Sequence, residues 1–217
     1  EKSHSYSNVV TVSDGIIAVN GLSLDTIGEV VKYDFNGNVV WENTEKKYQF
    51  QGLTAVEDGV VATGVKGKVI KYDLSGNIVW ENTEKTYEYE EIIAVEDGLI
   101  AVCYNGQVVK FGLDGNIIWE NTENSYSYSD VTTVENGMIA IGSDSDRYNI
   151  GRVIKYDLEG NILWENSIVC SIYCFFCSYI VSIYVFCKVY GISIFIHFIY
   201  CKFYSLYWFF CYFIYFC

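Results

Sequence analysis

A twelve-residue segment recurs four times along the chain, and this repeat constrains the fold more than any other feature. Its copies occupy residues 32–43, 71–82, 110–121 and 155–166, and each ends in Trp-Glu-Asn. The four tryptophans, Trp41, Trp80, Trp119 and Trp164, follow one another at intervals of 39, 39 and 45 residues. A second segment, Val-x-Asp-Gly or Val-x-Asn-Gly, precedes each copy in the same phase. The chain is therefore built from four similar units of about 40 residues each.

Each unit contains four short runs with the composition of β-strands. In the second unit these runs are 51–56, 60–63, 68–73 and 77–81, and Asp-Gly and Ser-Gly pairs mark turns between them. The units contain no proline and no long stretch of helical periodicity. Four short strands per unit of about 40 residues is the period of a propeller blade. We therefore expect an all-β fold, a β-propeller-type array of four four-stranded blades at about 5–43, 44–82, 83–121 and 122–166; a β-solenoid or an open array of hairpins is the alternative.

The turn between the third and fourth strands has its own chemistry. An aspartate that opens the turn can accept backbone N–H bonds within it, and a glycine can close it in the left-handed conformation. The expected aspartates are Asp34, Asp73 and Asp157, and the expected glycines are Gly37, Gly76, Gly115 and Gly160. The third unit has Phe111-Gly112 in place of Tyr-Asp, so we expect its turn to lack the carboxylate cap.

The segment Lys-Tyr-Asp-x-x-Gly-Asn-x-x-Trp resembles the PQQ-like (quinoprotein-type) propeller repeat, a relative of WD40-like repeats. The resemblance covers residues 5–166 and differs from the usual pattern by one residue between Asp and Gly. It implies that the motif spans the two outer strands of each blade and that the tryptophan packs between neighbouring blades. Most repeats of this kind bind no quinone, and we carry over no active site and no cofactor. Four blades are fewer than such propellers usually contain, so we expect a partial propeller.

A pair of aromatic residues follows each of the first three tryptophans by seven and nine residues. These pairs are Tyr48 and Phe50, Tyr87 and Tyr89, and Tyr126 and Tyr128. They could ring the mouth of a central channel and bind a peptide or stack on a sugar. The alternative, which we favour, is that they fill the space between blades as ordinary core.

Charge and chemistry narrow the function further. Residues 1–166 hold twelve basic and all 27 acidic residues, a net charge of −15, which disfavours nucleic acid as a partner. His4 lies near the start and Cys103 has no neighbouring histidine in sequence, so we expect no catalytic residue. The loop 143–149 holds aspartates and an asparagine but lacks the glycine and glutamate of a calcium-binding EF-hand loop. We expect no metal site there.

The C-terminal tail, residues 167–217, differs from the rest of the chain. It holds seven of the eight cysteines, 20 aromatic residues, two lysines and no acidic residue. It is long enough to span a membrane, which would make the protein membrane-anchored. The alternative, which we favour, is an out-of-frame translation of AT-rich DNA, because the repeat stops abruptly after Asn166.

The sequence therefore indicates a non-catalytic repeat module that binds a protein, a glycan or another ligand, on a bacterial surface or secreted. Length varies between units in the loops 20–29 and 142–152, between the second and third strands. Since ligands commonly bind to variable loops on a rigid scaffold, this face is the expected binding face. The alternatives are a fragment of a quinoprotein-like propeller enzyme and a membrane-anchored sensor or assembly factor.

Overall fold

The computed structural model describes residues 6–20, 28–45, 48–123, 125–144 and 150–167 with their side chains. For residues 147–149, 168–177, 180–189, 192–203 and 206–215 it describes the backbone alone. Predictions about residues 21–27 and about the side chains of 145–149 and 168–217 lie outside the described part.

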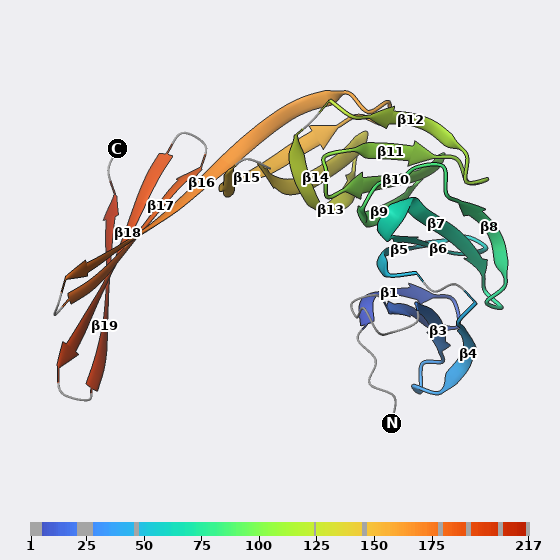
Figure 1. Ribbon diagram of the computed structural model, residues 1–217, viewed down its shortest axis with the longest axis horizontal. Coiled ribbons are helices and arrows are strands. Elements are labelled where there is room, and N and C mark those ends of the chain that lie inside the picture. Colours follow the sequence, from blue (N-terminus) through green and yellow to red (C-terminus); the bar gives the residue numbers. More distant parts are fainter. Residues whose placement is uncertain are drawn as a thin grey trace.

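The described chain consists of consecutive antiparallel sheets (Figure 1). The first sheet contains β1 (Tyr6–Val12), β2 (Gly15–Asn20), β3 (Glu29–Tyr33) and β4 (Val39–Asn43). The second contains β5 (Phe50–Val56), β6 (Gly59–Gly64), β7 (Lys68–Asp73) and β8 (Ile78–Asn82), with a short 3-10 turn, η1 (Val65–Gly67), between β6 and β7. The third contains β9 (Tyr89–Val95), β10 (Gly98–Cys103), β11 (Val108–Phe111) and β12 (Ile117–Asn121). The fourth begins with β13 (Tyr126–Val134), β14 (Gly137–Asp144), β15 (Arg147–Tyr156) and β16 (Ile162–Cys177).

Every strand pairs with the next one in the chain, so each sheet is a simple up-and-down meander. Tight turns such as Asp58-Gly59 and Ser75-Gly76 join the strands, as the turn-forming residues predict. The four sheets follow one another along an arc (Figure 1). The expected array of four four-stranded, blade-like sheets is therefore confirmed.

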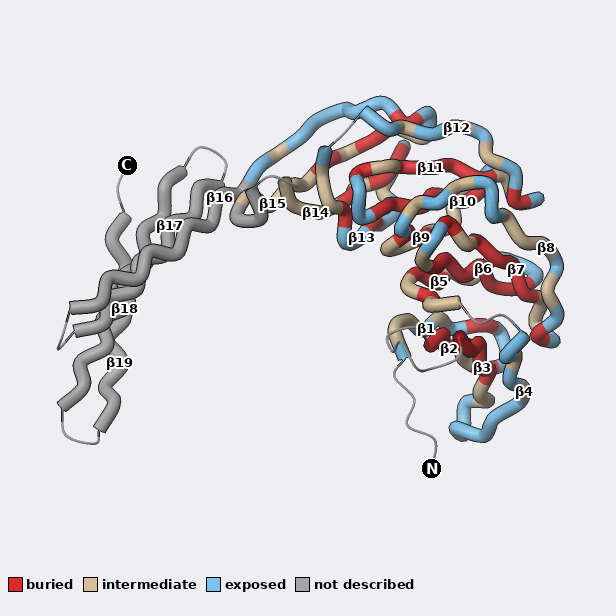
Figure 2. Tube along the Cα trace, viewed as in Figure 1, coloured by how far each residue is buried: buried red, intermediate tan, exposed pale blue. Residues whose placement is uncertain are grey.

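The core lies between adjacent sheets rather than within one of them. Three clusters of buried residues each combine one face of a sheet with the opposing face of the next sheet. In the second cluster, for example, Val61 and Val69 of the second sheet pack against Leu99, Val109 and Phe111 of the third. Burial is concentrated in the middle strands, whereas β4 and β12 contain only intermediate and exposed residues (Figure 2). The hydrophobic effect therefore acts mainly across the joints between sheets.

The fourth sheet continues past its fourth strand. The backbone of β17 (Ile180–Val189), β18 (Ile192–Phe203) and β19 (Leu206–Tyr215) extends the strand order that begins at β13. The membrane and frameshift interpretations of the tail concern side chains outside the described part. Among the described residues, no helix has the length and apolar character that crossing a membrane would require.

Candidate functional site

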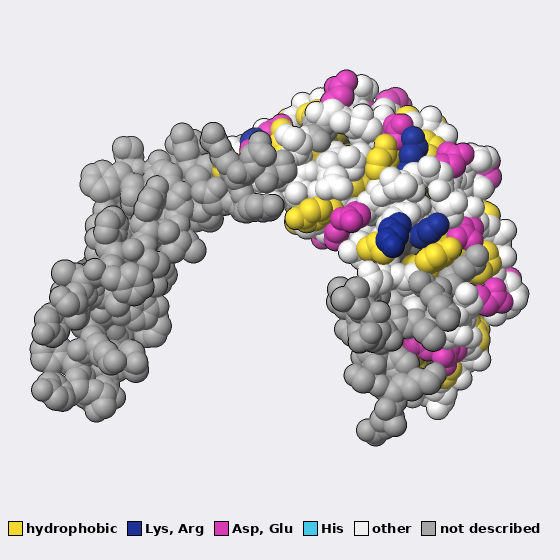
Figure 3. Space-filling model, in the orientation of Figure 1, with side chains coloured by type: hydrophobic (Ala, Val, Ile, Leu, Met, Phe, Trp, Pro, Cys, Tyr) yellow, Lys and Arg dark blue, Asp and Glu magenta, His cyan; other side chains and the backbone are white. Residues whose placement is uncertain are grey.

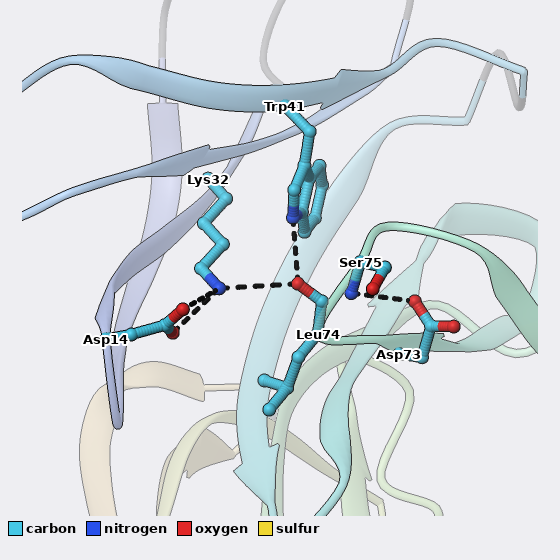
Figure 4. Close-up of polar contacts among 6 residues, drawn as sticks. All are labelled: Asp14, Lys32, Trp41, Asp73, Leu74 and Ser75. Atoms are coloured by element: carbon cyan, nitrogen blue, oxygen red, sulfur yellow. Dashed lines mark hydrogen bonds and ion pairs between the residues drawn. The ribbon is translucent and has the colours of Figure 1, made fainter.

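Neighbouring sheets are joined by a repeated polar contact, which we call the inter-blade clamp. Three side chains of one sheet hold the turn between the third and fourth strands of the next sheet. Figure 4 shows two of them, Lys32 and Trp41, at the first joint. Trp41 Nε1 donates to the carbonyl oxygen of Leu74 at 2.9 Å, and Lys32 Nζ reaches the same oxygen at 3.3 Å. Asn43 Nδ2 donates to the carbonyl oxygen of Gly76 at 2.8 Å.

The clamp recurs at the other two joints. Trp80 donates to the carbonyl of Leu113 at 3.0 Å, and Trp119 donates to that of Leu158 at 3.1 Å. The corresponding asparagines, Asn82 and Asn121, donate to the carbonyls of Gly115 and Gly160. The three tryptophans therefore lie between neighbouring sheets.

Aspartates build the turns that the clamps hold. Asp73 Oδ1 accepts the backbone N–H groups of Ser75 and Asn77 at 2.8 and 2.9 Å, and its Oδ2 accepts the Asn77 side chain. These hydrogen bonds, chiefly that from Asn77, lower the pKa of the Asp73 carboxyl below its usual value. Asp34 and Asp157 make the same contacts in the first and fourth sheets.

The third sheet corrects one expectation. Its turn was expected to lack a carboxylate cap, because Gly112 replaces the aspartate. Asp114, two residues later, supplies one instead: it accepts the backbone N–H of Asn116 at 3.1 Å and the side-chain amide at 2.7 Å. The carboxylate is thus shifted along the turn rather than lost.

An ion pair within each of the first three sheets fixes the lysine of the clamp. Lys32, Lys71 and Lys110 are buried, and each lies 2.7 Å from an aspartate of the turn between the first and second strands. The partners are Asp14, Asp58 and Asp97. The hydrogen bond from Lys71 lowers the pKa of Asp58, and the other two carboxyls shift in the same direction for the same reason.

The aromatic pairs divide into an inner and an outer set. The inner members, Phe50, Tyr89 and Tyr128, are almost fully buried and belong to the core clusters. Each contacts its outer partner edge to face, with ring centroids 6.2 to 6.4 Å apart. The outer members are half-buried and donate their hydroxyl groups to glutamates of the fourth strand of each sheet: Tyr48 to Glu81, Tyr87 to Glu120 and Tyr126 to Glu165.

A cation lies over each outer ring. Lys68 and Lys85 lie 5.1 and 5.8 Å from the ring centroids of Tyr48 and Tyr87, and the Arg152 guanidinium lies 5.1 Å from that of Tyr126. Lys85 and Arg152 also form ion pairs with the glutamates of their sets. We call these three Tyr–Glu–cation sets the aromatic rim. It lies on the side of the β4–β5 and β6–β7 connections, where cationic side chains stand beside acidic and apolar ones (Figure 3).

Sequence reasoning missed a group on the innermost strands. Asn8 of the first sheet donates to Glu91 of the third at 2.9 Å, across 83 residues of sequence. Burial raises the pKa of Glu91 above its usual value. Both residues lie at or beside irregularities in the pairing of their strands, where Gly52 and Asp130 occupy the corresponding positions. The sequence shows a polar residue at this position in three of the four units, Asn8, Glu91 and Asp130, but nothing in it indicates that Asn8 and Glu91 meet.

The variable loop and the cysteine considered in the sequence analysis contribute no catalytic or metal-binding group within the described residues. Asp144 of the variable loop pairs with Arg152 at 3.1 Å, and the side chains of 145–149 lie outside the described part. Cys103 is buried, and burial raises the pKa of its thiol, which disfavours the reactive thiolate. Within the described residues, no group of three His, Cys, Asp or Glu side chains converges to hold a metal ion.

The described residues also do not fit an anionic quinone cofactor. Such a group would need several cations at one place, but the described lysines and arginine are distributed over the sheets. Lys32, Lys71 and Lys110 are each paired with an aspartate of their own sheet, and the cations of the aromatic rim each cover a separate ring.

Solved structures share this arrangement of sheets at low sequence identity. BamB from Moraxella catarrhalis is 16% identical with a TM-score of 0.59, and the match covers 88% of this chain and 56% of that one. The Dos1 propeller is 10% identical with a TM-score of 0.61, covering 91% and 67% of the two chains. The computationally designed Ika8 protein is 11% identical with a TM-score of 0.60, covering 93% and 72%. The chain thus spans little more than half the length of the BamB structure.

A search among curated proteins gave no match. The family model described as PQQ_2, outer membrane protein assembly factor BamB, matches residues 26–171. This match covers more than half of the chain and agrees with the repeat, the clamps and the structural similarity. The chain therefore belongs to the PQQ_2 family of BamB-type β-propeller repeat proteins.

Proposed function

We propose that the protein is a non-catalytic binding module of the bacterial envelope that recognises a protein partner through the aromatic rim. The family supports an envelope location, since its description names an outer membrane assembly factor. The observation that carries the proposal is the contrast between the two sides of the sheets. On the clamp side, carboxylates, amides and lysines are engaged in turns and joints, whereas the aromatic rim is half-exposed and repeats from sheet to sheet.

The chemistry of the rim favours a polypeptide over a sugar. A cation already covers one face of Tyr48, Tyr87 and Tyr126, so at most one face of each ring is left for stacking on a sugar. Carboxylate and cation side by side can instead bind the polar groups of an extended chain, and tyrosine supplies rigid apolar contact. The rim is thus suited to a partner segment that crosses several sheets.

A selection experiment tests this proposal. Peptides from a phage-displayed random library are selected on the purified chain, and a glycan array is probed in parallel. A rim variant, Lys68→Gln, Lys85→Gln and Arg152→Gln combined, should bind the selected peptides at least about tenfold more weakly. A control variant with Val79→Ser and Ile118→Ser, on exposed positions of β8 and β12, should bind them as the parent does.

Glycans captured without peptides, or equal loss of peptide binding in both variants, would contradict a role of the rim in protein recognition. Fractionation of the source cells tests the location: the protein should separate with the envelope, and recovery from the cytoplasmic fraction alone would contradict that part of the proposal.

A further inference from the structure

The innermost strand of each sheet has an irregularity in its pairing, and a side chain at that point binds the backbone. In three sheets this side chain accepts the N–H of the residue that follows it. The distances are 2.8 Å from Val9 to Asn8, 2.9 Å from Ile92 to Glu91 and 2.7 Å from Val131 to Asp130. The second sheet has Gly52 at the corresponding position, which has no side chain for this contact.

Glu91 of the third sheet also contacts the inner strands of the first two sheets. Its Oε2 accepts Asn8 Nδ2 of the first sheet at 2.9 Å. A hydrogen bond from the backbone of Leu53, the residue after Gly52, reaches it from the second sheet. A Cβ atom on Gly52 would lie 2.9 Å from Glu91 Cα, so the glycine lets β5 and β9 approach this closely. One carboxylate thus binds donors from three successive sheets.

These donors depend on the protonation of Glu91 to different degrees. An ionised carboxylate only accepts hydrogen bonds, whereas a protonated one accepts less well and gains an O–H donor. The backbone donors of Leu53 and Ile92 belong to paired strands, which hold them in place. Asn8 makes its contact with a side-chain amide, which rotates without moving a strand. Asn8 is therefore the donor that a protonated carboxyl releases most easily.

We propose that Glu91 is a proton-controlled lock between the first and third sheets: its ionised carboxylate binds Asn8, and its protonated form releases it. The side-chain amide of Asn8 favours the ionised form and so lowers the pKa of Glu91. By thermodynamic linkage, protonation of Glu91 must weaken the contact with Asn8 to the same extent. The lock does not depend on the function proposed for the aromatic rim.

Two features make Glu91 easier to protonate than an exposed glutamate. Burial raises its pKa above the usual value, and the negative charge of Asp130 on β13 acts in the same direction. β5 and β6 have no titratable side chain. The other titratable residues of β9 and of the elements packed against it are Tyr6, Lys66, Tyr89, Glu90, Cys103, Tyr126 and Tyr128. Burial raises the pKa of these tyrosines and of the cysteine, which therefore stay neutral in acid, and it also raises the pKa of Glu90.

The joints between the sheets do not lose their charges in the same pH range. Their aspartates, such as Asp58 and Asp73, have pKa values below the usual one, so Glu91 is protonated first as the pH falls. Because the pKa of Glu91 is raised by folding, the folded chain binds this proton more tightly than the unfolded chain, and protonation at this site stabilises the fold. Release of Asn8 is thus a local event rather than the start of unfolding.

NMR titration of the full chain in mild detergent, with ¹³C-labelled glutamate and ¹⁵N-labelled asparagine, tests the lock between about pH 8 and pH 4. The carboxyl signal that is missing from Glu91→Gln identifies Glu91. In the parent, the side-chain amide signals of Asn8 should shift with the same midpoint as this carboxyl. In Glu91→Gln they should not shift over this range, because the amide does not titrate.

Three further variants measure the coupling in the other direction. Asn8→Ala removes the donor and should move the midpoint of Glu91 to higher pH by about 0.5. Asn36→Ala, the same substitution at an exposed position of the first sheet, is the matched control and should leave the midpoint unchanged. Asp130→Asn removes the neighbouring charge and should move the midpoint to lower pH.

A midpoint that Asn8→Ala leaves unchanged would overturn the proposal. Asn8 signals of the parent that do not follow Glu91 would overturn it as well. The second measurement needs no substitution of Asn8, so it decides the question even if Asn8→Ala fails to fold.

Discussion

Among single residues, the turn glycines show most clearly how the sheets fit together. Gly37, Gly76, Gly115 and Gly160 all have φ between 84° and 87°, in the left-handed region that favours glycine. Gly76, Gly115 and Gly160 need glycine for a second reason as well: a tryptophan ring of the preceding sheet lies where a Cβ atom would be. At Gly37 no atom of the described residues lies within 4 Å of such a Cβ atom, so the backbone conformation alone constrains it there.

Substitution by asparagine separates these two requirements, because asparagine tolerates the left-handed conformation better than other side chains. We expect Gly76→Asn to lower the free energy of unfolding by about 2 kcal/mol through the clash with Trp41. Gly37→Asn should cost less than about 1 kcal/mol. Urea unfolding of both variants measures the difference; equal losses would show that the ring contact does not matter.

The carboxylate of the third turn provides another prediction at this scale. Asp114 caps the turn from a position two residues later than Asp73 does in the second sheet. If the shifted cap is equivalent, Asp114→Ala should lower the melting temperature about as much as Asp73→Ala does. Exposed Glu96→Ala, outside the capped turns, is the control. No effect of Asp114→Ala would mean that the third turn holds its shape without a cap.

Within each of the first three sheets, the first hairpin is tied to the third strand by the lysine–aspartate pair. The lysine stem is buried and its ammonium lies between an aspartate of its own sheet and, at two joints, a carbonyl of the next one. At these two joints the lysine therefore stabilises its own sheet and the contact with the next sheet at the same time.

This pair predicts a pH dependence. The pKa of Asp58 in the folded protein is lowered by Lys71, below the usual value of about 3.9 for an unfolded chain. Its contribution to stability is therefore present above that value and is lost as the pH falls through the folded-state pKa. Thermal melts between pH 6 and pH 2 should show the parent losing more stability than Asp58→Asn, so that the two curves converge at low pH. A constant gap between them would contradict this role.

Much of each sheet could be predicted from the sequence, because strand composition and Asp-Gly turns act locally. The contacts between sheets could be predicted only in outline. The resemblance implied that the tryptophans pack between blades, but the carbonyl that Trp41 reaches depends on where the next turn lies. The Asn8–Glu91 contact joins the first and third sheets, and no local pattern brings them together. The cap by Asp114 was missed because the prediction required the carboxylate to stand at one fixed position.

In the whole molecule, the sheets form a linear series in which each contacts its neighbours through the same kind of joint. Stability should then depend strongly on Trp41, Trp80 and Trp119, which donate to the next sheet, and little on Trp164, which is 41% exposed. Trp80→Ala should destabilise the chain by about 3 kcal/mol, whereas Trp164→Ala should cost less than about 1 kcal/mol. Denaturant unfolding at low protein concentration measures the free energy of unfolding of both variants. Similar losses would contradict the claim that the tryptophans stabilise the chain through contacts between sheets.

Hydrogen exchange of the tryptophan indole N–H groups, followed by NMR on the monomeric chain, tests the repeated clamp most directly. Tryptophan-to-phenylalanine variants assign the signals. The indoles of Trp41, Trp80 and Trp119 donate to backbone carbonyls of the next sheet at 2.9 to 3.1 Å, so their protons should exchange slowly. The indole of Trp164, which is 41% exposed, should exchange rapidly. If all four exchange at the same rate, the sheets are not joined by the clamp described above.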